Sequence, residues 1–230
     1  MPYSTEWWYC VKDTPFDINA VKSKRRYEIV KGCKNFSCEI AKNLLLYADE
    51  IFDVAVAAFS EYPDEYRPVL NKVTFCRTLK TWEENQSINF IMCKDNSGRI
   101  CGYAVIEKNK NCANLQVVKT NPICEKLQIN AAIVKFIVDT YLPEYYICDG
   151  ERPLRHHTHY QEYLCKYFEF RMVYCKLNIK YRAWFKIILF MMFPLRFVFY
   201  KISQIRNSKL LYNIVSILEQ ERIRRTFVES

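Results

Sequence analysis

The feature that most constrains the fold is a run of strand-like segments that leads into one long amphipathic helix. Ser87 to Cys93 and Ile100 to Glu107 read as paired strands, and Asp95 to Gly98 between them has the composition of a hairpin turn. A third strand is predicted from Ala113 to Thr120, and Glu125 to Leu142 then repeats apolar residues at helical spacing. A helix between strands of one sheet predicts a mixed α/β fold.

Further elements are expected on both sides of this block. Before it we predict strands at Glu6–Lys12, Tyr27–Gly32 and Phe36–Ile40, and helices at Asp17–Lys22, Glu50–Glu61 and Lys72–Asn85. After it we predict a strand at Tyr145–Cys148, a helix at Tyr160–Phe168 and a strand at Arg171–Tyr181. The basic cluster Lys22–Arg26 is either a phosphate-holding turn or, as favoured here, a solvated turn.

Composition restricts the class of protein. Half of the residues are hydrophobic, which is enough for a real core and excludes wholesale disorder. The net charge of +9 favours acidic partners such as nucleic acid, a phosphorylated ligand or an anionic membrane, or reflects a merely soluble basic protein. The eleven cysteines have no regular spacing, and residues 1–10 lack the pattern expected of a signal peptide. We therefore expect free thiols and a cytoplasmic location.

The polar stretch from Ile147 to Gln161 is the predicted functional site. It holds all three histidines and follows a predicted buried strand that Asp149-Gly150 should end. Thr158 is a predicted cap for the next helix. Ligands of α/β sheets commonly bind where a strand ends and a helix begins. A metal site is disfavoured, because His-His-x-His is too crowded for tetrahedral geometry and has no cysteines at zinc spacing.

The order of elements from Ile88 to Tyr181 resembles the acyltransferase fold of the GNAT superfamily. The N-terminal basic cluster before a strand, and a helix carrying Asn130 in place of a glycine-rich loop, are more similar to the FemXAB-type aminoacyltransferase branch. The resemblance implies a splayed sheet, an acyl-CoA between the fourth and fifth strands, and a pyrophosphate at the N-terminus of the central helix. The cofactor-binding residues that it implies are Val117, Val118, Thr120, Lys126, Gln128 and Asn130.

One departure from the superfamily pattern affects the donor. The usual loop follows Arg/Gln-x-x-Gly-x-Gly/Ala, whereas Thr120 to Gln128 contains no glycine and places Glu125 beside the expected phosphates. Ordinary acetyl-CoA binding conflicts with this loop, and an aminoacyl-tRNA donor would ease the conflict. FemXAB-type proteins normally span two such domains, whereas this chain has room for one. We therefore predict one GNAT-like domain over residues 1–181, in which residues 1–86 are a degenerate half.

Acyl transfer needs a base for the acceptor and a group that polarises the carbonyl. We expect His156 or His157 to act as base or acceptor ligand, and Arg152 to anchor an anionic group, with Asp149 as a neighbour in the site. The alternative is that the histidines cap the helix and decorate a loop.

The C-terminal extension, residues 182–230, is predicted to form amphipathic helices. Its unbroken apolar run, Ile187 to Leu195, has nine residues, whereas a spanning helix needs about twenty. Basic residues on one side and aromatic residues on the other predict a helix that lies in a membrane interface and is kinked at Pro194. The alternative is a helix that packs on the domain or on a second subunit. A second amphipathic helix, Leu210–Phe227, is predicted to follow it.

Two functions remain open at this point. The first is an acyltransferase for an amine or hydroxyl acceptor, such as an envelope or polysaccharide precursor, at the inner face of the membrane. The second is a non-catalytic scaffold of the same fold at the membrane surface. The expected partners are a small-molecule acyl donor and acceptor, an anionic membrane through residues 182–201, and a second copy of the chain. Nucleic acid is not expected, apart from an aminoacyl-tRNA donor.

Overall fold

The computed structural model describes residues 5–64, 67–154, 159–206 and 208–226. Its strands are β1 (Trp8–Lys12), β2 (Phe36–Ala41), β3 (Ile88–Asp95), β4 (Ile100–Asn109), β5 (Cys112–Thr120), β6 (Tyr146–Glu151) and β7 (Arg171–Tyr174). Its α-helices are α1 (Ser23–Asn35), α2 (Ala48–Ser60), α3 (Lys72–Glu84), α4 (Ile129–Tyr141), α5 (Tyr160–Phe168), α6 (Ala183–Met192), α7 (Arg196–Ile205) and α8 (Lys209–Thr226). Three 3-10 turns are η1 (Leu44–Tyr47), η2 (Pro122–Leu127) and η3 (Phe193–Leu195).

The chain divides into two compact units, which are described separately. The larger unit comprises residues 11–150 and 160–171, and the C-terminal unit comprises residues 1–10, 151–159 and 172–230. The strand order is β2-β3-β4-β5-β6-β1-β7, and β1, β6 and β7 carry residues of both units. The predicted domain boundary between residues 181 and 182 stays a prediction.

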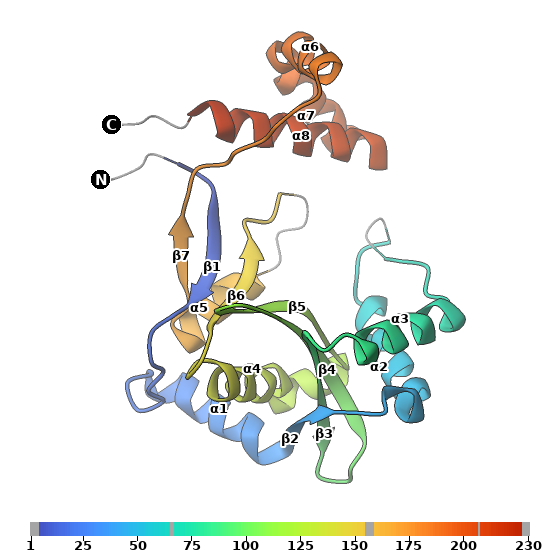
Figure 1. Ribbon diagram of the computed structural model, residues 1–230, viewed down its shortest axis with the longest axis vertical. Coiled ribbons are helices and arrows are strands. Elements are labelled where there is room, and N and C mark those ends of the chain that lie inside the picture. The colour runs from blue at the N-terminus through green and yellow to red at the C-terminus, as the bar shows by residue number, and fades with distance from the viewer. Residues whose placement is uncertain (1–4, 65–66, 155–158, 207, 227–230) are drawn as a thin grey trace. The chain divides into compact units, whose positions relative to one another are not determined.

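The larger unit is built on a mixed sheet with helices on both faces. β2, β3, β4 and β5 pair antiparallel, and β6 joins β5 in parallel after the α4 crossover. α1 and α4 pack together on one face, whereas α2 and α3 cover the other (Figure 1). The apolar core under α2 and α3 includes Ile51, Leu79, Phe90 and Tyr103, all nearly inaccessible to solvent. The mixed α/β sheet predicted from the sequence is therefore confirmed.

Most predicted elements are also confirmed, within a few residues at their ends. They are β1, β2, β3, β4 and β5 among the strands, and α2, α3, α5 and α8 among the helices. The hairpin between β3 and β4 forms as expected, because the Asp95 carboxylate accepts hydrogen bonds from the backbone of Ser97 and Arg99. Gly102 allows a close approach, since a Cβ there would lie 3.0 Å from the Ile129 side chain.

The predicted strand at Tyr27–Gly32 was wrong, because these residues belong to α1. The alternation of apolar and charged residues there coincides with a helical pattern, in which Ile29 and Gly32 lie one turn apart and are both buried. α1 packs against α4, so the buried face of Ile29 and Gly32 is set by a helix that is distant in the sequence. The basic cluster therefore lies at the start of a helix and does not lead into a strand.

Gly32 lies at a close contact between α1 and the start of α4. A Cβ at this position would lie 2.4 Å from the Gln128 carbonyl oxygen, which is backbone and must shift to make room. We expect Gly32→Ala to lower the free energy of unfolding by about 1–3 kcal/mol, although alanine alone would favour a helix by about 1 kcal/mol. Urea denaturation measures the change, with Val30→Ala on the exposed side of α1 as the control. A stabilised Gly32→Ala variant would contradict this packing.

Four smaller predictions need correction. Asp17 does not cap a helix: its carboxylate accepts from the Asn19 backbone and closes a turn. α4 begins at Ile129, after η2 and a left-handed Gln128, so the predicted first turn from Glu125 is not α-helical. β6 continues through Asp149 and Gly150 to Glu151, since Gly150 adopts a positive φ within the strand. β7 is shorter than predicted and ends at Tyr174.

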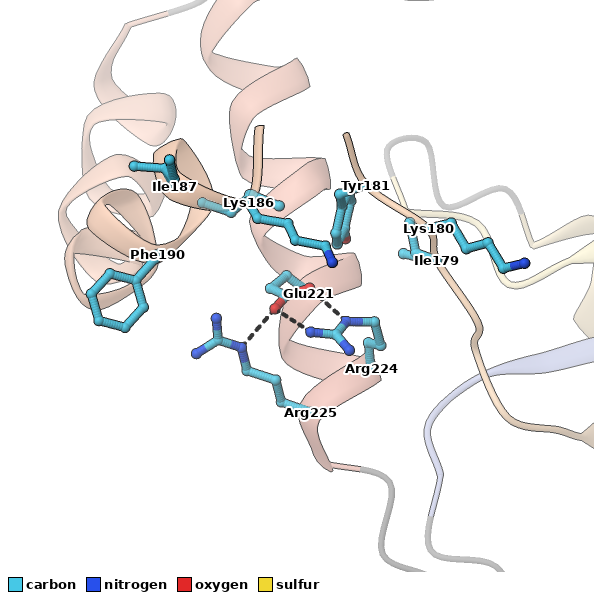
Figure 2. A pocket seen from close by; sticks show the side chains of 10 residues that line it. Ile179, Lys180, Tyr181, Lys186, Ile187, Phe190, Glu221, Arg224 and Arg225 are labelled. Carbon is cyan, nitrogen blue, oxygen red and sulfur yellow. Dashed lines mark hydrogen bonds and ion pairs between the residues drawn. The ribbon is translucent and has the colours of Figure 1, made fainter. Parts of the chain in front are cut away.

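The C-terminal unit contains α6, α7 and α8. Pro194 lies in η3, which separates α6 from α7 where the sequence predicted an interruption. Among the described residues, one segment, Ala183–Ile205, is long and apolar enough to cross a membrane, judged by length and composition alone. Only 6% of its most apolar stretch is buried. The unit also encloses a cavity between α6, α8 and the segment before α6 (Figure 2).

Candidate functional site

The sheet of the larger unit splits between β5 and β6. The two strands pair only at their beginnings, and the last pair is Asn114 with Cys148. Directly after this pair, β5 carries a bulge: Leu115 and Val117 pair with consecutive residues of β4, which leaves Gln116 as the extra residue. A bulge bends its strand and increases its twist, so β5 turns away from β6 at this point. The splayed sheet implied by the resemblance is thus present.

Asp149 lies where the split begins, because it is the first residue of β6 after the last pair with β5. Its side chain is half-buried. Burial disfavours the charged form and raises the pKa of Asp149 to about 7, while a hydrogen bond with the Gln161 side chain opposes the shift. A carboxyl group with a pKa near 7 can take up and release a proton at neutral pH, as a general base must.

The segment that would form the pyrophosphate-binding loop folds as the η2 turn. The Asn121 side chain accepts from Ile123 N at 3.1 Å, Cys124 N donates to Asn121 O at 2.9 Å, and Gln128 N donates to Glu125 O at 2.9 Å. α1 closes the turn from the outside: Lys31 Nζ donates to Lys126 O at 2.9 Å. Three backbone amides of this segment, those of Ile123, Cys124 and Gln128, therefore donate within the turn and are not available to a ligand.

This arrangement does not fit the phosphates of CoA in the way that the resemblance implies. The loop has no glycine through which backbone could approach the ligand, and Glu125 projects an exposed carboxylate beside it. A donor held by other contacts, such as an aminoacyl ester, does not need this cradle. No chemical step is therefore assigned to CoA.

The predicted donor residues are only partly brought together. Thr120 and Ile129 both flank Gly102, so the end of β5 meets the start of α4, where Gln128 and Asn130 lie. Val118 pairs with Ala104 in the same region of the sheet. Val117, in contrast, packs into the core on the α2 and α3 face, and Lys126 is exposed.

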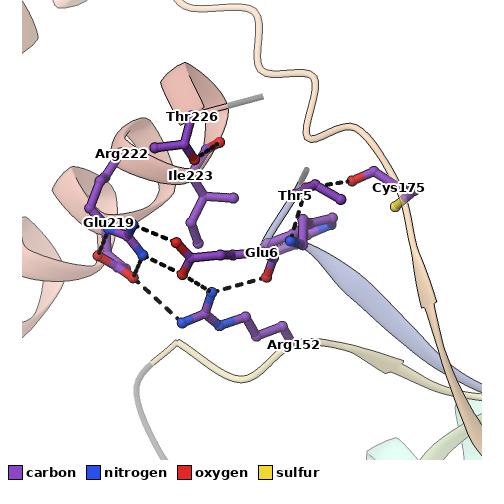
Figure 3. Close-up of polar contacts among 9 residues, drawn as sticks. Thr5, Glu6, Arg152, Cys175, Glu219, Arg222, Ile223 and Thr226 are labelled. Atoms are coloured by element: carbon purple, nitrogen blue, oxygen red, sulfur yellow. Dashed lines mark hydrogen bonds and ion pairs between the residues drawn. The ribbon is translucent and has the colours of Figure 1, made fainter. Parts of the chain in front are cut away.

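Arg152 belongs to the C-terminal unit and lies in an ion-pair network (Figure 3). Its Nη1 donates to the Glu6 carbonyl at 3.0 Å and to the Glu6 carboxylate at 3.2 Å, and its Nη2 lies 3.5 Å from Glu219. Arg222 binds the same two carboxylates, and its hydrogen bond is the main cause of a Glu6 pKa of about 2. An anionic substrate at Arg152 would compete with these partners. The role proposed for Arg152 stays a prediction.

Of the predicted histidines, His159 lies within the described residues and is exposed. His156 and His157, with Thr158, lie outside the described residues. Within the described ranges, no group of three His, Cys, Asp or Glu side chains is arranged to hold a metal ion.

Lys119 is a polar residue of this region that the sequence did not single out. Its ammonium lies 2.8 Å from the Tyr62 hydroxyl, and 4.3 Å and 4.8 Å from the ring centroids of Phe59 and Tyr62. These partners come from α2 and the residues just after it. The sequence around Lys119 does not reveal these contacts, because Phe59 and Tyr62 are distant from Lys119 in the chain.

Comparisons with known proteins find similar solved structures at low sequence identity. No family model matches the chain, and no curated protein matches it. Two similar solved structures are the C-terminal domain (DUF2156) of a putative lysylphosphatidylglycerol synthetase from Agrobacterium fabrum (12% identity, TM-score 0.45) and L-PGS from Bacillus licheniformis (8%, 0.45). Each match covers 66% of this chain and 48% of the other, so this chain spans about half their length.

A third similar structure is a GNAT-family acetyltransferase from Staphylococcus aureus, with 11% identity and a TM-score of 0.38 over 46% of this chain and 65% of the other. At these values the similarity concerns the fold alone. The FemXAB-like branch stays a prediction. The solved structures similar to this chain thus include a GNAT-family acetyltransferase and lysylphosphatidylglycerol synthetase structures.

Proposed function

We propose that this protein is an acyltransferase that transfers an acyl group from an activated ester to an amine or hydroxyl acceptor. The observation that carries the proposal is Asp149, a half-buried carboxyl with a pKa near 7, at the point where β5 and β6 split. The acceptor nitrogen or oxygen attacks the acyl carbonyl, and the Asp149 carboxylate takes the acceptor's proton. The bond from the acyl carbon to the donor oxygen or sulfur then breaks, and Asp149 passes the proton to that atom, so the donor leaves as an alcohol or thiol and the carboxylate is restored. An aminoacyl-tRNA is favoured as donor over acyl-CoA because η2 fills the phosphate loop.

The acceptor that we propose is an envelope or polysaccharide precursor at the cytoplasmic face of a membrane. Exposed aromatic residues on α6 and α7 support a peripheral association, since Phe190 and Phe197 expose 74% and 64% of their surface. Self-association through α8 is a further prediction about partners.

Thermal unfolding with candidate donors tests the proposal. A donor at one hundred times its dissociation constant adds about 2.7 kcal/mol, which raises Tm by roughly 5–10 °C for a chain of this size. We expect this shift with an aminoacylated tRNA acceptor stem, and a much smaller one with acetyl-CoA, longer acyl-CoAs or CoA. The uncharged acceptor stem is the control for non-specific binding by a basic protein. No shift with any donor would contradict the proposal.

Transfer to a simple amine then identifies the base. Asp149→Asn should lower the rate by at least 100-fold without weakening donor binding, because it removes the proton acceptor and keeps the shape. His156→Ala and His157→Ala are the matched variants for the histidine base predicted from the sequence. A loss of rate in the histidine variants alone would move the role away from Asp149.

The second candidate function is a non-catalytic protein at the membrane surface. The closed η2 turn favours it, because a non-catalytic protein does not need an open loop for a donor. This function predicts no stabilisation by any donor but strong binding to vesicles. Exchanging Phe190 and Phe197 for glutamate should abolish that binding, since both side chains are exposed and their replacement leaves the core intact.

A further inference from the structure

The C-terminal unit contains a cavity of about 720 Å³ that the acyl-transfer proposal does not use. Figure 2 shows it between α6, α8 and the segment that leads into α6. Its charged lining residues are Lys180, Lys186, Glu221, Arg224 and Arg225. Its other lining residues include Tyr181, Ile187 and Phe190.

Positive charge exceeds negative charge in this cavity. Glu221 is 2% exposed and accepts two hydrogen bonds from Arg224, both 2.8 Å, and one from Arg225 Nε at 2.7 Å. Burial opposes the ionisation of Glu221, but the two arginines outweigh it and lower the pKa to about 2, so the carboxylate is charged. Four cations against one carboxylate leave three positive charges uncompensated by the lining.

Arg225 has a fixed guanidinium group whose terminal nitrogens can bind a ligand. Its guanidinium carbon lies 3.9 Å from the ring centroid of Phe193, which fixes the plane of the group. Nε binds Glu221, and within the described part of the chain the terminal nitrogens make no hydrogen bond, while 40% of the side chain is exposed. Lys180 and Lys186 likewise form no ion pair with any described residue. These groups can donate to phosphate oxygens.

The rim of the cavity is apolar, and further apolar side chains of the C-terminal unit are exposed. Ile187 and Phe190 line the cavity and are 62% and 74% exposed. Further exposed apolar side chains lie on α6, η3 and α7: Trp184, Met191, Leu195, Phe197, Val198 and Ile205. Cationic groups directly beside exposed aliphatic and aromatic side chains match a ligand with a charged head and hydrocarbon tails.

We propose that this cavity binds the phosphate headgroup of an anionic membrane lipid, with α6 lying in the acyl region beside it. A free phosphate would leave the apolar rim exposed, whereas a lipid covers it. The inference rests on the membrane association proposed above and is independent of acyl transfer.

Titration calorimetry of the full chain with dihexanoyl phosphatidic acid tests the site. The lipid is kept below its micelle concentration, so that the charged surface of a membrane does not contribute to binding. We expect one lipid per chain. Arg225→Lys keeps the charge but loses the planar fork, and should weaken binding at least tenfold. Lys186→Gln should weaken it about fivefold or more, as expected for one phosphate contact. Lys201→Gln on α7, outside the cavity lining, removes the same charge and should change affinity less than twofold.

Further ligands separate the proposal from its alternatives. Inorganic phosphate and dihexanoyl phosphatidylcholine should each bind at least tenfold more weakly than the anionic lipid, because the first lacks tails and the second adds a cation. Equal affinity for inorganic phosphate, or unchanged binding by both Arg225→Lys and Lys186→Gln, would overturn the lipid site. Asp149→Asn should bind the lipid as the natural chain does, so failure of the acyl-transfer proposal leaves this result readable. Thermal unfolding of each variant identifies those that no longer fold.

Discussion

Glu221→Ala is expected to lower the free energy of unfolding by about 2–3 kcal/mol, the largest loss predicted for any single side chain of the C-terminal unit. The substitution leaves Arg224 and Arg225 beside each other without the buried carboxylate that both bind. The two arginine side chains are 39% and 40% exposed, so water partly solvates them and the loss stays below that of a fully buried pair. Denaturant unfolding followed by circular dichroism measures the loss, and Glu221→Gln separates charge from shape.

The pH dependence of this effect has a definite sign. The folded-state pKa of Glu221 is about 2, below its ordinary value of 4.5, so its ionised form stabilises the fold fully above pH 4.5. The contribution is lost as the pH falls from about 4.5 to about 2, and the variant and the natural chain should converge there. Glu84→Ala is the control, because its pair with Lys80 is largely exposed and should contribute less than about 1 kcal/mol. A loss at Glu221 no larger than at Glu84 would contradict the buried network.

Asp149→Asn is expected to stabilise the protein at pH 8 and to leave its stability unchanged near pH 4. Burial keeps the Asp149 carboxyl protonated in the folded state up to about pH 7, whereas the unfolded chain ionises it near 3.8. Because the folded state binds more protons between these values, stability falls as the pH rises from about 4 to 7. Asparagine has no charge to bury and avoids this loss. The difference between the two pKa values sets its upper limit at about 4 kcal/mol, and because the side chain is only half-buried we expect about 1–2 kcal/mol, or roughly 3–6 °C in Tm.

Thermal unfolding between pH 4 and pH 8.5 measures the Asp149 effect. Asp53→Asn on the exposed face of α2 is the matched control and should not change stability with pH by more than about 0.5 kcal/mol. A destabilised Asp149→Asn variant at pH 8 would mean that the carboxylate is charged and favourably bound in the folded protein, and Asp149 would then lose its role as a neutral-pH base.

Local sequence patterns predicted the elements whose determinants are close in the chain. The β3–β4 hairpin follows from Asp95 and Gly98, and the body of α4 from its apolar repeat. α1 was mistaken for a strand because the burial of Ile29 and Gly32 depends on α4, which no local pattern reveals. The η2 turn was not predicted from the sequence for a related reason. The sequence shows that the segment has no glycine, but it does not show that Lys31 of α1 contacts the turn.

The sequence named Asp149 as part of the candidate site but not as its base. It ended the strand at Asp149-Gly150, whereas β6 continues to Glu151. It favoured the neighbouring histidines as bases, because histidine titrates near neutral pH without help. The raised pKa of Asp149 depends on burial that only the folded chain provides. Likewise, the partners of Arg152 are Glu6 and Glu219, which come from the two ends of the chain. The lipid cavity depends on the packing of α6 and α8, so its cations appeared in the sequence only as a dispersed basic charge.

The pH dependence of kcat/KM for acyl transfer from an aminoacyl ester to an amine tests the central claim most directly. If Asp149 is the base, kcat/KM should rise with an apparent pKa near 7 and level off above it, and Asp149→Asn should remove this rise together with at least 100-fold of the rate. An Asp149→Asn variant with the rate and the pH profile of the natural chain would contradict the account.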